Sequence, residues 1–433
     1  LYLYSRFFII NNMKVLWIVN KPIGALHEKL FGKKSTGGLW MEAMLERSRR
    51  DQSISIVIVN ISLVKEVQKY VFKNEMYYTI PGTPDSTYDY KSKLAHEYWR
   101  EIFKTEKPDL IELWGTELPF GIPALEEAGN IPSVVYVQGI LDSIGRYYQA
   151  GLTAEELRKS RTFRDVITGS TIKKIQKGYL KRAVIETKLA SMSKNIIVEN
   201  QWAESYYMRM CHDIRVFKCP LSISEAFSSV EWSVDKMQRH TIMCSAANYP
   251  IKGLHMLLKA LTIVKIHYPN VKLFVPGTPL RPVNSIKSWM KQNGYDKLIH
   301  SMITELGLKD VILYTGRLTA EGMAKKMSEV NAFVMCSAIE NHSSTLKEAM
   351  SVGVPCVASY VGGVPEYAHN RENCLLYRFE DYEHLALNLI NLFRSQDLCK
   401  KLSIQSRFDM KKSCEQNDFY QISKDIYRAI LNR

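Results

Sequence analysis

The chain has 433 residues, 46% of them apolar, so it is long enough for two domains with substantial cores. Its formal net charge of +14 indicates an anionic partner: nucleic acid, a phosphorylated substrate or an anionic membrane surface. No zinc-finger spacing and no RNA-binding aromatic signature occur in the sequence, which argues against nucleic acid. No apolar run approaches the length of a membrane span, and the eight cysteines form no Cys-x-x-Cys pair, which favours buried free thiols over disulfides or zinc.

Apolar runs rich in β-branched residues alternate with helical stretches in the first half of the chain, a pattern that indicates a parallel doubly wound sheet. Met13 opens the first run. We expect it to be the initiator, because residues 1–12 are short and lack the cleavage site of a signal peptide. The predicted strands are Val15 to Asn20, Ser53 to Asn60, Leu110 to Leu113, Val134 to Val137 and Ile196 to Val198.

The polar segment Ser222 to Arg239 holds few strand or helix signals and is the predicted domain boundary. The same alternation then begins again, so the predicted fold class is α/β, with two Rossmann-like parallel-sheet domains facing a ligand-binding cleft. The expected parts are residues 13–225, residues 238–414 and a final helix within 415–433. Strands of the second half are predicted at Ile242 to Ser245, Lys272 to Val275, Val311 to Tyr314, Ala332 to Cys336 and Cys356 to Ala358.

Chemistry-bearing residues follow the last two predicted strands. Glu340 comes just after one strand, Glu348 lies in the helix start that follows, and Gly362-Gly363 comes just after the next strand. Ligands of open parallel sheets bind beyond the carboxyl ends of the strands. A carboxylate accepts from two hydroxyls at once, a helix N-terminus favours phosphate, and glycine lets the backbone approach a ligand. The order of these features therefore predicts a site for a sugar, a ribose and a diphosphate, although neither the eight-residue spacing nor the Gly-Gly is informative alone.

These motifs resemble the signature of retaining family 4 glycosyltransferases, and the resemblance extends loosely from residue 13 to about residue 430. It implies the two-domain GT-B architecture, a nucleotide-sugar donor and a last helix that crosses back to the first domain. It also implies that Glu340 holds the sugar hydroxyls and Glu348 the ribose diol, with Asn341 and His342 on the donor side. The matching motifs are Glu340-x7-Glu348-Ala-Met, Gly353-Val-Pro355 and Gly362-Gly363-x-Pro365-Glu366.

Two more segments resemble the family. Gly37-Gly38 lies between the first strand and a helix, where the family commonly places a Gly-Gly near the donor diphosphate and the acceptor. Lys252 precedes Gly253 at the corresponding place in the second half, where the family lysine meets the donor phosphates with charge-assisted contacts. The family usually has an arginine five residues earlier, where this chain has Ala247. Arg317 either supplies the missing charge or is an ordinary surface arginine.

Other positions depart further from the family. Histidines are frequent there at the places held here by Glu112, Trp114 and Gln138, so a simple histidine base is not expected. Gln138 and Glu117, at strand ends of the first half, are predicted on the acceptor side, and His342 is predicted to be a loop residue near the sugar rather than a catalyst. No Asp-x-Asp and no His/Asp/Glu cluster with metal-ligand spacing occurs, so we expect neither a metal nor another cofactor.

The stretch from Arg158 to Lys188 carries ten lysines or arginines and only two acids, Asp165 and Glu186. Isoleucines and a leucine lie among the basic residues. The stretch is either a solvated helix that packs on one face or a surface for an anionic membrane or a lipid-diphosphate acceptor.

Together these features and the resemblance predict a cytoplasmic retaining glycosyltransferase, which would be peripheral at the inner face of a membrane if the basic stretch is a membrane surface. It is expected to move a hexose from a nucleotide diphosphate sugar to a glycan or lipid-linked glycan in surface polysaccharide biosynthesis. A nucleotide-sugar epimerase of the same architecture, and a non-catalytic protein that binds nucleotide sugars or polyanions, stay open as alternatives. The epimerase needs acid–base groups around the sugar, and few such groups occur in the first half.

Overall fold

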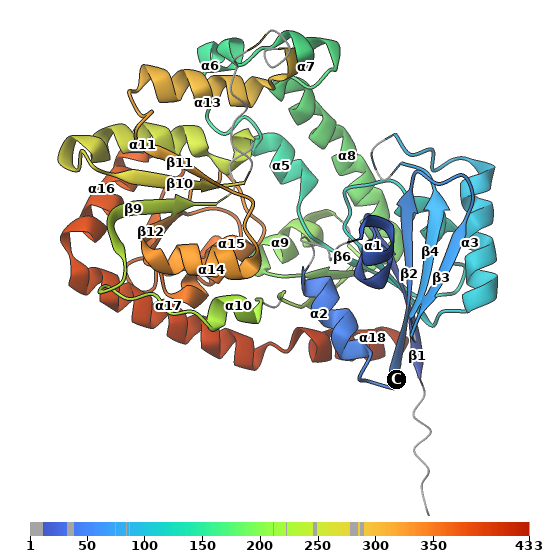
Figure 1. Ribbon diagram of the computed structural model, residues 1–433. Helices are drawn as coiled ribbons and strands as arrows, with labels where there is room; N and C mark the ends of the chain where they lie inside the picture. Colours follow the sequence, from blue (N-terminus) through green and yellow to red (C-terminus); the bar gives the residue numbers. More distant parts are fainter. Residues whose placement is uncertain are drawn as a thin grey trace, which may run out of the picture.

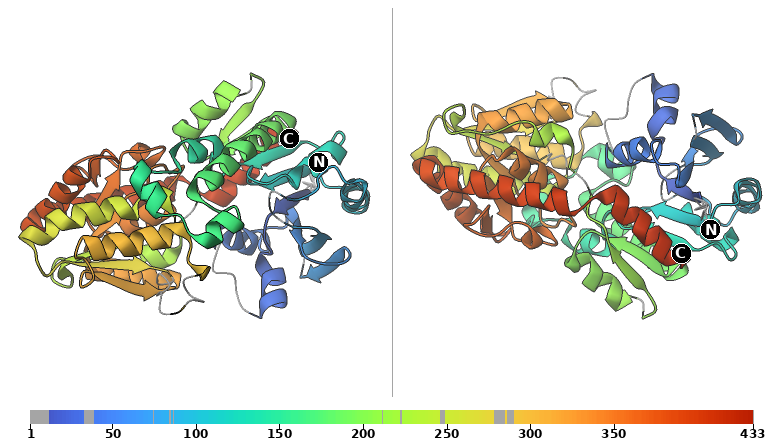
Figure 2. Two further views of the ribbon diagram at one scale, coloured as in Figure 1. Left: turned by 90° about the horizontal axis from the view of Figure 1, so that it is seen from above. Right: turned by 90° about the horizontal axis from the view of Figure 1, so that it is seen from below.

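The computed structural model describes residues 12–432, apart from 33–38, 74, 84, 86, 211, 222, 246–248, 278–284 and 286–289. Two α/β halves lie side by side, each built on its own sheet, and the C-terminal helices run along the bottom of both (Figure 1). Views from above and below show the same two bodies joined at the middle (Figure 2).

The first sheet has eight strands in the order β3-β4-β2-β1-β5-β6-β7-β8. All neighbours are parallel except β3 and β4, which form an antiparallel hairpin at the edge. The central strands are buried apolar runs at the predicted places, whereas β3, β4 and β8 were not predicted. The strands are β1 (Met13–Val19), β2 (Ile54–Ser62), β3 (Gln68–Phe72), β4 (Glu75–Pro81), β5 (Leu110–Trp114), β6 (Ser133–Tyr136), β7 (Asn195–Val198) and β8 (Arg215–Lys218).

The second sheet has six parallel strands in the order β11-β10-β9-β12-β13-β14. Five of them lie where the sequence predicts strands, and the short β14 was not predicted. The strands are β9 (Gln238–Cys244), β10 (Lys272–Pro276), β11 (Ile312–Gly316), β12 (Val330–Met335), β13 (Cys356–Ser359) and β14 (Leu375–Tyr377).

Helices cover both sheets. Those before β9 are α1 (Gly24–Phe31), α2 (Leu39–Ser48), α3 (Lys93–Glu106), α4 (Gly121–Glu127), α5 (Leu141–Tyr147), α6 (Ala154–Lys159), α7 (Phe163–Ile167), α8 (Ile172–Ser193), α9 (Gln201–Met210) and α10 (Glu225–Ser228). Those after β9 are η1 (Pro250–Lys252), α11 (Leu254–His267), α13 (Gly294–Glu305), α14 (Ala320–Glu329), α15 (Ser344–Val352), η2 (Val364–Glu366), α16 (Tyr382–Arg394), α17 (Gln396–Gln416) and α18 (Phe419–Leu431). None of the described helices is both long and apolar enough to cross a membrane.

Residues 148–172 belong to the first half of the sequence but pack into the core of the second. Tyr148, Leu157 and Ile172 are buried in the same cluster as the strands of the second sheet. The backbone oxygen of Ala150 accepts a hydrogen bond from Nε2 of His255 on α11, at 2.7 Å. This arm therefore joins the two halves through apolar contact as well as through hydrogen bonds.

Helix α18 returns to the first sheet, and its apolar face shares a core with β1 and β2. The Tyr427 hydroxyl donates to the buried carboxyl of Glu112 on β5, and burial raises the pKa of that carboxyl to about 8. Trp114, two residues on, stacks on Tyr136 within the same core. Both family-histidine positions on β5 are thus occupied here by core residues, which explains why neither faces a ligand.

Candidate active site

Glu340 and Lys252 form an ion pair at the carboxyl end of the second sheet. Lys252 ends η1, after β9, and Glu340 lies in the loop after the neighbouring strand β12. Lys252 Nζ lies 2.6 Å from Glu340 Oε1, and the Ser337 hydroxyl donates to the same oxygen at 2.6 Å. Burial alone would lower the pKa of Lys252, but the Glu340 carboxylate raises it above its usual value. The pair is therefore a charged lysine with a carboxylate shared with Ser337, and both side chains are largely buried.

Gly362 and Gly363 support the Glu340 loop directly. Gly362 has φ +51°, and a Cβ there would lie 1.8 Å from the carbonyl oxygen of Glu340. The Gly363 N–H donates to that same oxygen at 3.2 Å. The sequence predicts that these glycines open the backbone to a ligand, and the structure instead shows the Gly363 N–H bonded within the protein. Their small size fixes the position of Glu340.

Asn341 ties the Glu340 loop to the first half of the chain. Its Nδ2 donates to the backbone oxygen of Gln138 at 3.2 Å, and Asn200 Nδ2 donates to its carbonyl oxygen at 2.6 Å. The Gln138 side chain makes no hydrogen bond within the described ranges. Lys252, Glu340, Asn341 and Gln138 line one pocket of about 150 Å³ between the two sheets. The structure thus brings residues predicted for the donor and a residue predicted for the acceptor together in a single cavity.

His342 lines this small pocket, and its buried side chain lies near two titratable residues, Glu199 and Lys347, that sequence reasoning missed. Its ring lies 5.3 Å from that of Tyr367, and its Nε2 is 3.8 Å from Glu199 Oε2. Burial, with Lys347 nearby, holds the pKa of His342 well below its usual range. Neither ring nitrogen has a hydrogen-bond partner in the part of the chain that the structure describes. An imidazole with so low a pKa is a weak base, and the role of His342 as a loop residue near the sugar stays a prediction.

Glu199 and Lys347 are both buried and come from different halves of the chain. Burial raises the pKa of Glu199, and burial lowers that of Lys347. The signals for them in the sequence are weak: Glu199 directly follows β7, and Lys347 directly precedes Glu348. Both act on the buried His342, whose Nε2 lies 3.8 Å from Glu199 Oε2 and whose pKa Lys347 helps to lower.

Glu348 lies in the second turn of α15, where burial raises the pKa of its carboxyl to about 7. No hydrogen bond or ion pair to it occurs among the residues described. Arg317 is exposed just after β11, also without an ion pair in the described ranges, and it does not line the pocket of Glu340 and Lys252. Gly37, Gly38 and Ala247 lie outside the described residues.

Glu117 lies at the carboxyl end of the first sheet. Asn20, just after β1, donates to its Oε1 at 3.4 Å, and burial raises the pKa of Glu117. It does not line the pocket that holds Gln138. Among the described residues, no three His, Cys, Asp or Glu side chains gather as metal ligands.

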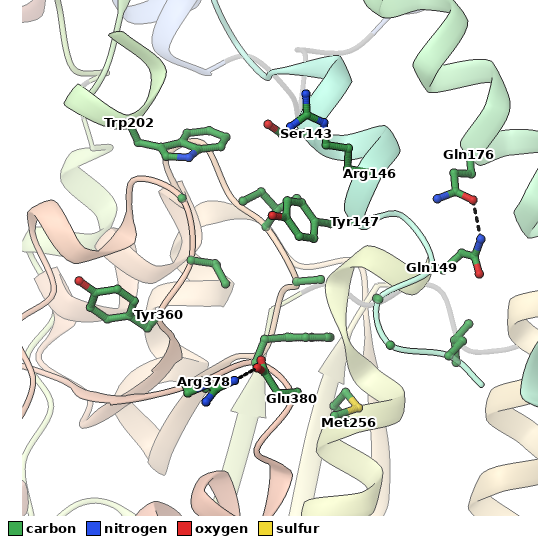
Figure 3. A pocket seen from close by; sticks show the side chains of 18 of the residues that line it. Ser143, Arg146, Tyr147, Gln149, Gln176, Trp202, Met256, Tyr360, Arg378 and Glu380 are labelled. Atoms are coloured by element: carbon green, nitrogen blue, oxygen red, sulfur yellow. Dashed lines mark hydrogen bonds and ion pairs between the residues drawn. The ribbon is translucent and has the colours of Figure 1, made fainter. Parts of the chain in front are cut away.

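A second cavity of about 1210 Å³ adjoins the small one, and both are lined by Trp202 and Ile339 (Figure 3). Its walls come from α5, α8 and α9 on one side and from the loops after β13 and β14 on the other. Tyr147 and Tyr360 are 53% and 61% exposed, so their rings are available to a ligand. Figure 3 shows Gln149 and Gln176 hydrogen-bonded to each other across part of the wall. Aromatic faces and amides of this kind suit a polar, ring-shaped ligand several units long.

Comparisons with known proteins agree with this architecture. Residues 229–408 match the model of the family described as "Glycosyl transferases group 1". N-acetyl-alpha-D-glucosaminyl L-malate synthase of Bacillus anthracis is 24% identical over 133 residues, which are 31% of this chain and 34% of that protein. The matched segments span from 28% to 66% of the length of the curated relatives.

Among solved structures, sucrose-phosphate synthase from Thermosynechococcus elongatus has a TM-score of 0.68 at 15% identity, over 97% of this chain and 99% of that one. Anabaena Alr3699/HepE in complex with UDP-glucose has a TM-score of 0.63 at 14% identity, over 97% of this chain and 100% of that one. The predicted fold class is thereby confirmed. The chain has the GT-B fold of glycosyltransferases, and its residues 229–408 match the model of the group 1 glycosyl transferases.

Proposed function

We propose that the chain is a retaining glycosyltransferase that moves a hexose from a nucleotide diphosphate sugar to a hydroxyl of a glycan or lipid-linked glycan, in surface polysaccharide biosynthesis. The observation that carries the proposal is the Lys252–Glu340 ion pair in a pocket between the two sheets. An ammonium suits the diphosphate and a carboxylate suits the sugar hydroxyls, so one donor molecule satisfies both members of the pair.

The donor's remaining parts find partners on α15. The N-terminus of this helix presents unbonded N–H groups that favour phosphate, and Glu348 in its second turn has no competing partner in the described chain. We assign Glu348 to the ribose diol and Arg317, if it turns inward on binding, to the diphosphate. Solved complexes of the neighbour HepE contain UDP and UDP-glucose, which supports a nucleotide sugar as the donor.

The same pocket supports retention of the anomeric configuration. A retaining front-face transfer needs no strong protein base, because the leaving phosphate oxygen takes the acceptor's proton while Lys252 stabilises the charge that builds on it. The pocket offers no strong base, because Glu340 is shared between Lys252 and Ser337 and burial holds the pKa of His342 well below its usual range. Gln138, which cannot take a proton, positions the acceptor.

We assign the large cavity of Figure 3 to the acceptor glycan. Its arginines and lysine already have carboxylate partners: Arg146 pairs with Asp142, Arg378 with Glu380, and Lys259 with Glu156. Arg209, at the same wall, lies 3.9 Å from Asp142. Among the described residues, the cavity wall therefore has no unpaired cation that could bind a phosphate. Its tyrosines, tryptophan and amides instead suit sugar rings. We also propose that the chain associates with the inner face of a membrane, through the surface formed by α6, α7 and the start of α8.

The test is an incubation of the protein with a panel of nucleotide sugars, UDP-glucose, UDP-N-acetylglucosamine and GDP-mannose among them. Proton NMR follows nucleotide release and the anomeric signal of any new linkage. Release with retained configuration supports the proposal, and an inverted linkage refutes the retaining mechanism. Isomerised donor would instead identify an epimerase, and tight binding without turnover of any donor would identify a non-catalytic binding protein.

A further inference from the structure

Three apolar side chains stand exposed on the short helix α7. Phe163, Val166 and Ile167 are 57%, 56% and 68% exposed. They occupy positions i, i+3 and i+4, so they lie on one face of the helix. Helix α7 lies at the upper edge of the molecule beside α6, away from both sheets (Figure 1). An exposed apolar face of this kind on a projecting helix indicates a surface for interaction with another molecule.

The opposite face of α7 is firmly attached. Asp165 is 2% exposed, and its Oδ2 accepts the backbone N–H of Gly294 at the start of α13, at 2.6 Å. The Ser170 hydroxyl donates to its other oxygen at 3.1 Å. A Cβ on Gly294 would lie only 2.2 Å from the backbone oxygen of Ser160, so the two segments are in close contact. The helix thus holds the three apolar side chains outward in a fixed orientation.

The exposed charge around this helix is predominantly positive. Both acids of the basic stretch, Asp165 and Glu186, are buried, so its exposed charges are all positive. Three acids from outside the stretch pair with its basic residues: Glu155 and Glu305 with Lys159, and Glu126 with Lys188. Six exposed basic side chains have no ion-pair partner in the described chain, and these are Arg158, Arg161, Lys173, Lys174, Lys177 and Lys181.

Three of these basic residues meet at one small cavity. Arg158 of α6, Arg161 of the following turn and Lys173 of α8 line a pocket of about 190 Å³ together with Thr171. Two guanidinium groups, an ammonium and a hydroxyl form a donor set that matches phosphate oxygens.

We propose that α6, α7 and the first turns of α8 dock on an anionic lipid bilayer. Phe163, Val166 and Ile167 enter the interface between headgroups and acyl chains, the unpaired basic residues face the anionic headgroups, and the Arg158–Arg161–Lys173 pocket takes a lipid phosphate. Exposed apolar side chains surrounded by unpaired positive charge match a bilayer, which offers acyl chains and negative headgroups over the same area. Gln176 of α8, which lies between Lys174 and Lys177 in the sequence, also lines the large cavity, so a lipid-linked acceptor would enter from the docked side.

The test is flotation of the full chain with phosphatidylcholine vesicles that contain or lack phosphatidylglycerol. One variant changes Phe163, Val166 and Ile167 to serine, and a second changes Lys173, Lys174 and Lys177 to glutamate. The matched apolar control changes Ile404 and Phe408 of α17, which are 71% and 60% exposed, to serine. The matched charge control changes Lys400, Lys401 and Lys412, three exposed lysines of the same helix without an ion-pair partner in the described chain, to glutamate. Circular dichroism melting checks that each variant folds.

We expect the native chain to float with phosphatidylglycerol vesicles at low salt and to dissociate as salt rises. Reversal of the three lysines should weaken binding by at least about a hundredfold. The serine variant should also bind weakly, and both controls should bind like the native chain. A native chain that ignores phosphatidylglycerol vesicles at low salt, or controls that lose as much binding as the α7 variant, would overturn the proposal. So would lipid-free self-association of the native chain that the serine variant abolishes, because the occupant would then be a second copy. None of these readouts depends on transferase activity.

Discussion

Donor binding should strengthen as pH rises through about 7, because of Glu348. Burial raises the pKa of this carboxyl to about 7, and no partner in the described chain stabilises its charge. A ribose diol needs the carboxylate form, whose two oxygens accept from both hydroxyls, so the donor binds the deprotonated protein. One pH unit below its pKa a carboxyl is ionised in about a tenth of the molecules, and one unit above in about nine-tenths. The donor's Kd should therefore fall about tenfold between about pH 6 and about pH 8, equivalent to about 1.4 kcal/mol.

Isothermal titration calorimetry with the tightest-binding nucleotide sugar measures this dependence. The diphosphate of a nucleotide sugar stays ionised throughout the range, so the ligand adds no slope of its own. Titration in two buffers with different ionisation enthalpies counts the proton released on binding below about pH 7. Glu348→Gln should bind more weakly at about pH 8 and show no pH dependence, whereas the control Glu383→Gln, on α16, should keep the native profile.

The raised pKa of Glu348 also determines how the stability of the fold changes with pH. The folded state raises the pKa of Glu348, so its contribution to stability is present at low pH and is lost as pH rises through about 7. The melting temperature of the ligand-free native chain, relative to Glu348→Gln, should fall over that window. A native Kd that is flat with pH, or a Glu348→Gln variant that keeps the native slope, would refute the assignment of Glu348 to the ribose.

The remaining predictions concern the pocket and its supports. Lys252→Ala should lower turnover by about a hundredfold or more, while the donor's Kd changes less. Glu340→Ala should alter turnover and sugar selectivity. Steady-state kinetics together with direct titration of the donor separates the effects on turnover from those on binding. Gly362→Ala should lower turnover at least about tenfold, because the new Cβ displaces the Glu340 loop. Gly178→Ala, which meets open space on α8, should stabilise the fold by about 0.5–1 kcal/mol in chemical denaturation. Transfer should persist in EDTA, because Lys252 and the α15 N-terminus act on the diphosphate; full loss that magnesium or manganese restores would contradict this.

Most of the strands that the sequence predicts are buried on both faces, although the buried β4 and β14 were missed. Runs such as Val15 to Asn20 are continuously apolar because helices cover both sides of the sheet. Strand β3 (Gln68–Phe72) was missed because it lies at the edge and no residue of it is fully buried, so its composition carries little signal. The packing of residues 148–172 on the second core was also beyond prediction. Local periodicity shows that Tyr148 and Ile172 are apolar, but not which sheet buries them.

The candidate site also has residues that local sequence predicts and residues that depend on how the two halves pack. Glu340, Asn341 and Gly362 are predictable because they follow neighbouring strands, and neighbouring parallel strands end at one edge of the sheet. Glu199 and His342 lie close together only because the two halves meet. The sequence pattern of either half does not predict how the two halves contact each other. The proximity of Glu199 and Lys347 could therefore be recognised only in the structure.

The Lys252–Glu340 pair gives the proposed function a physical basis for selecting complete donors. A nucleotide diphosphate alone would draw Lys252 to its phosphate and leave Glu340 buried without its cation, which is costly. A free sugar would engage Glu340 but offer Lys252 no anion. A nucleotide sugar supplies an anion and hydroxyls at adjacent positions, so both members of the pair exchange partners in one step. Discrimination of this kind comes from the unpaired charge that each incomplete ligand leaves behind, rather than from extra contacts to the complete one.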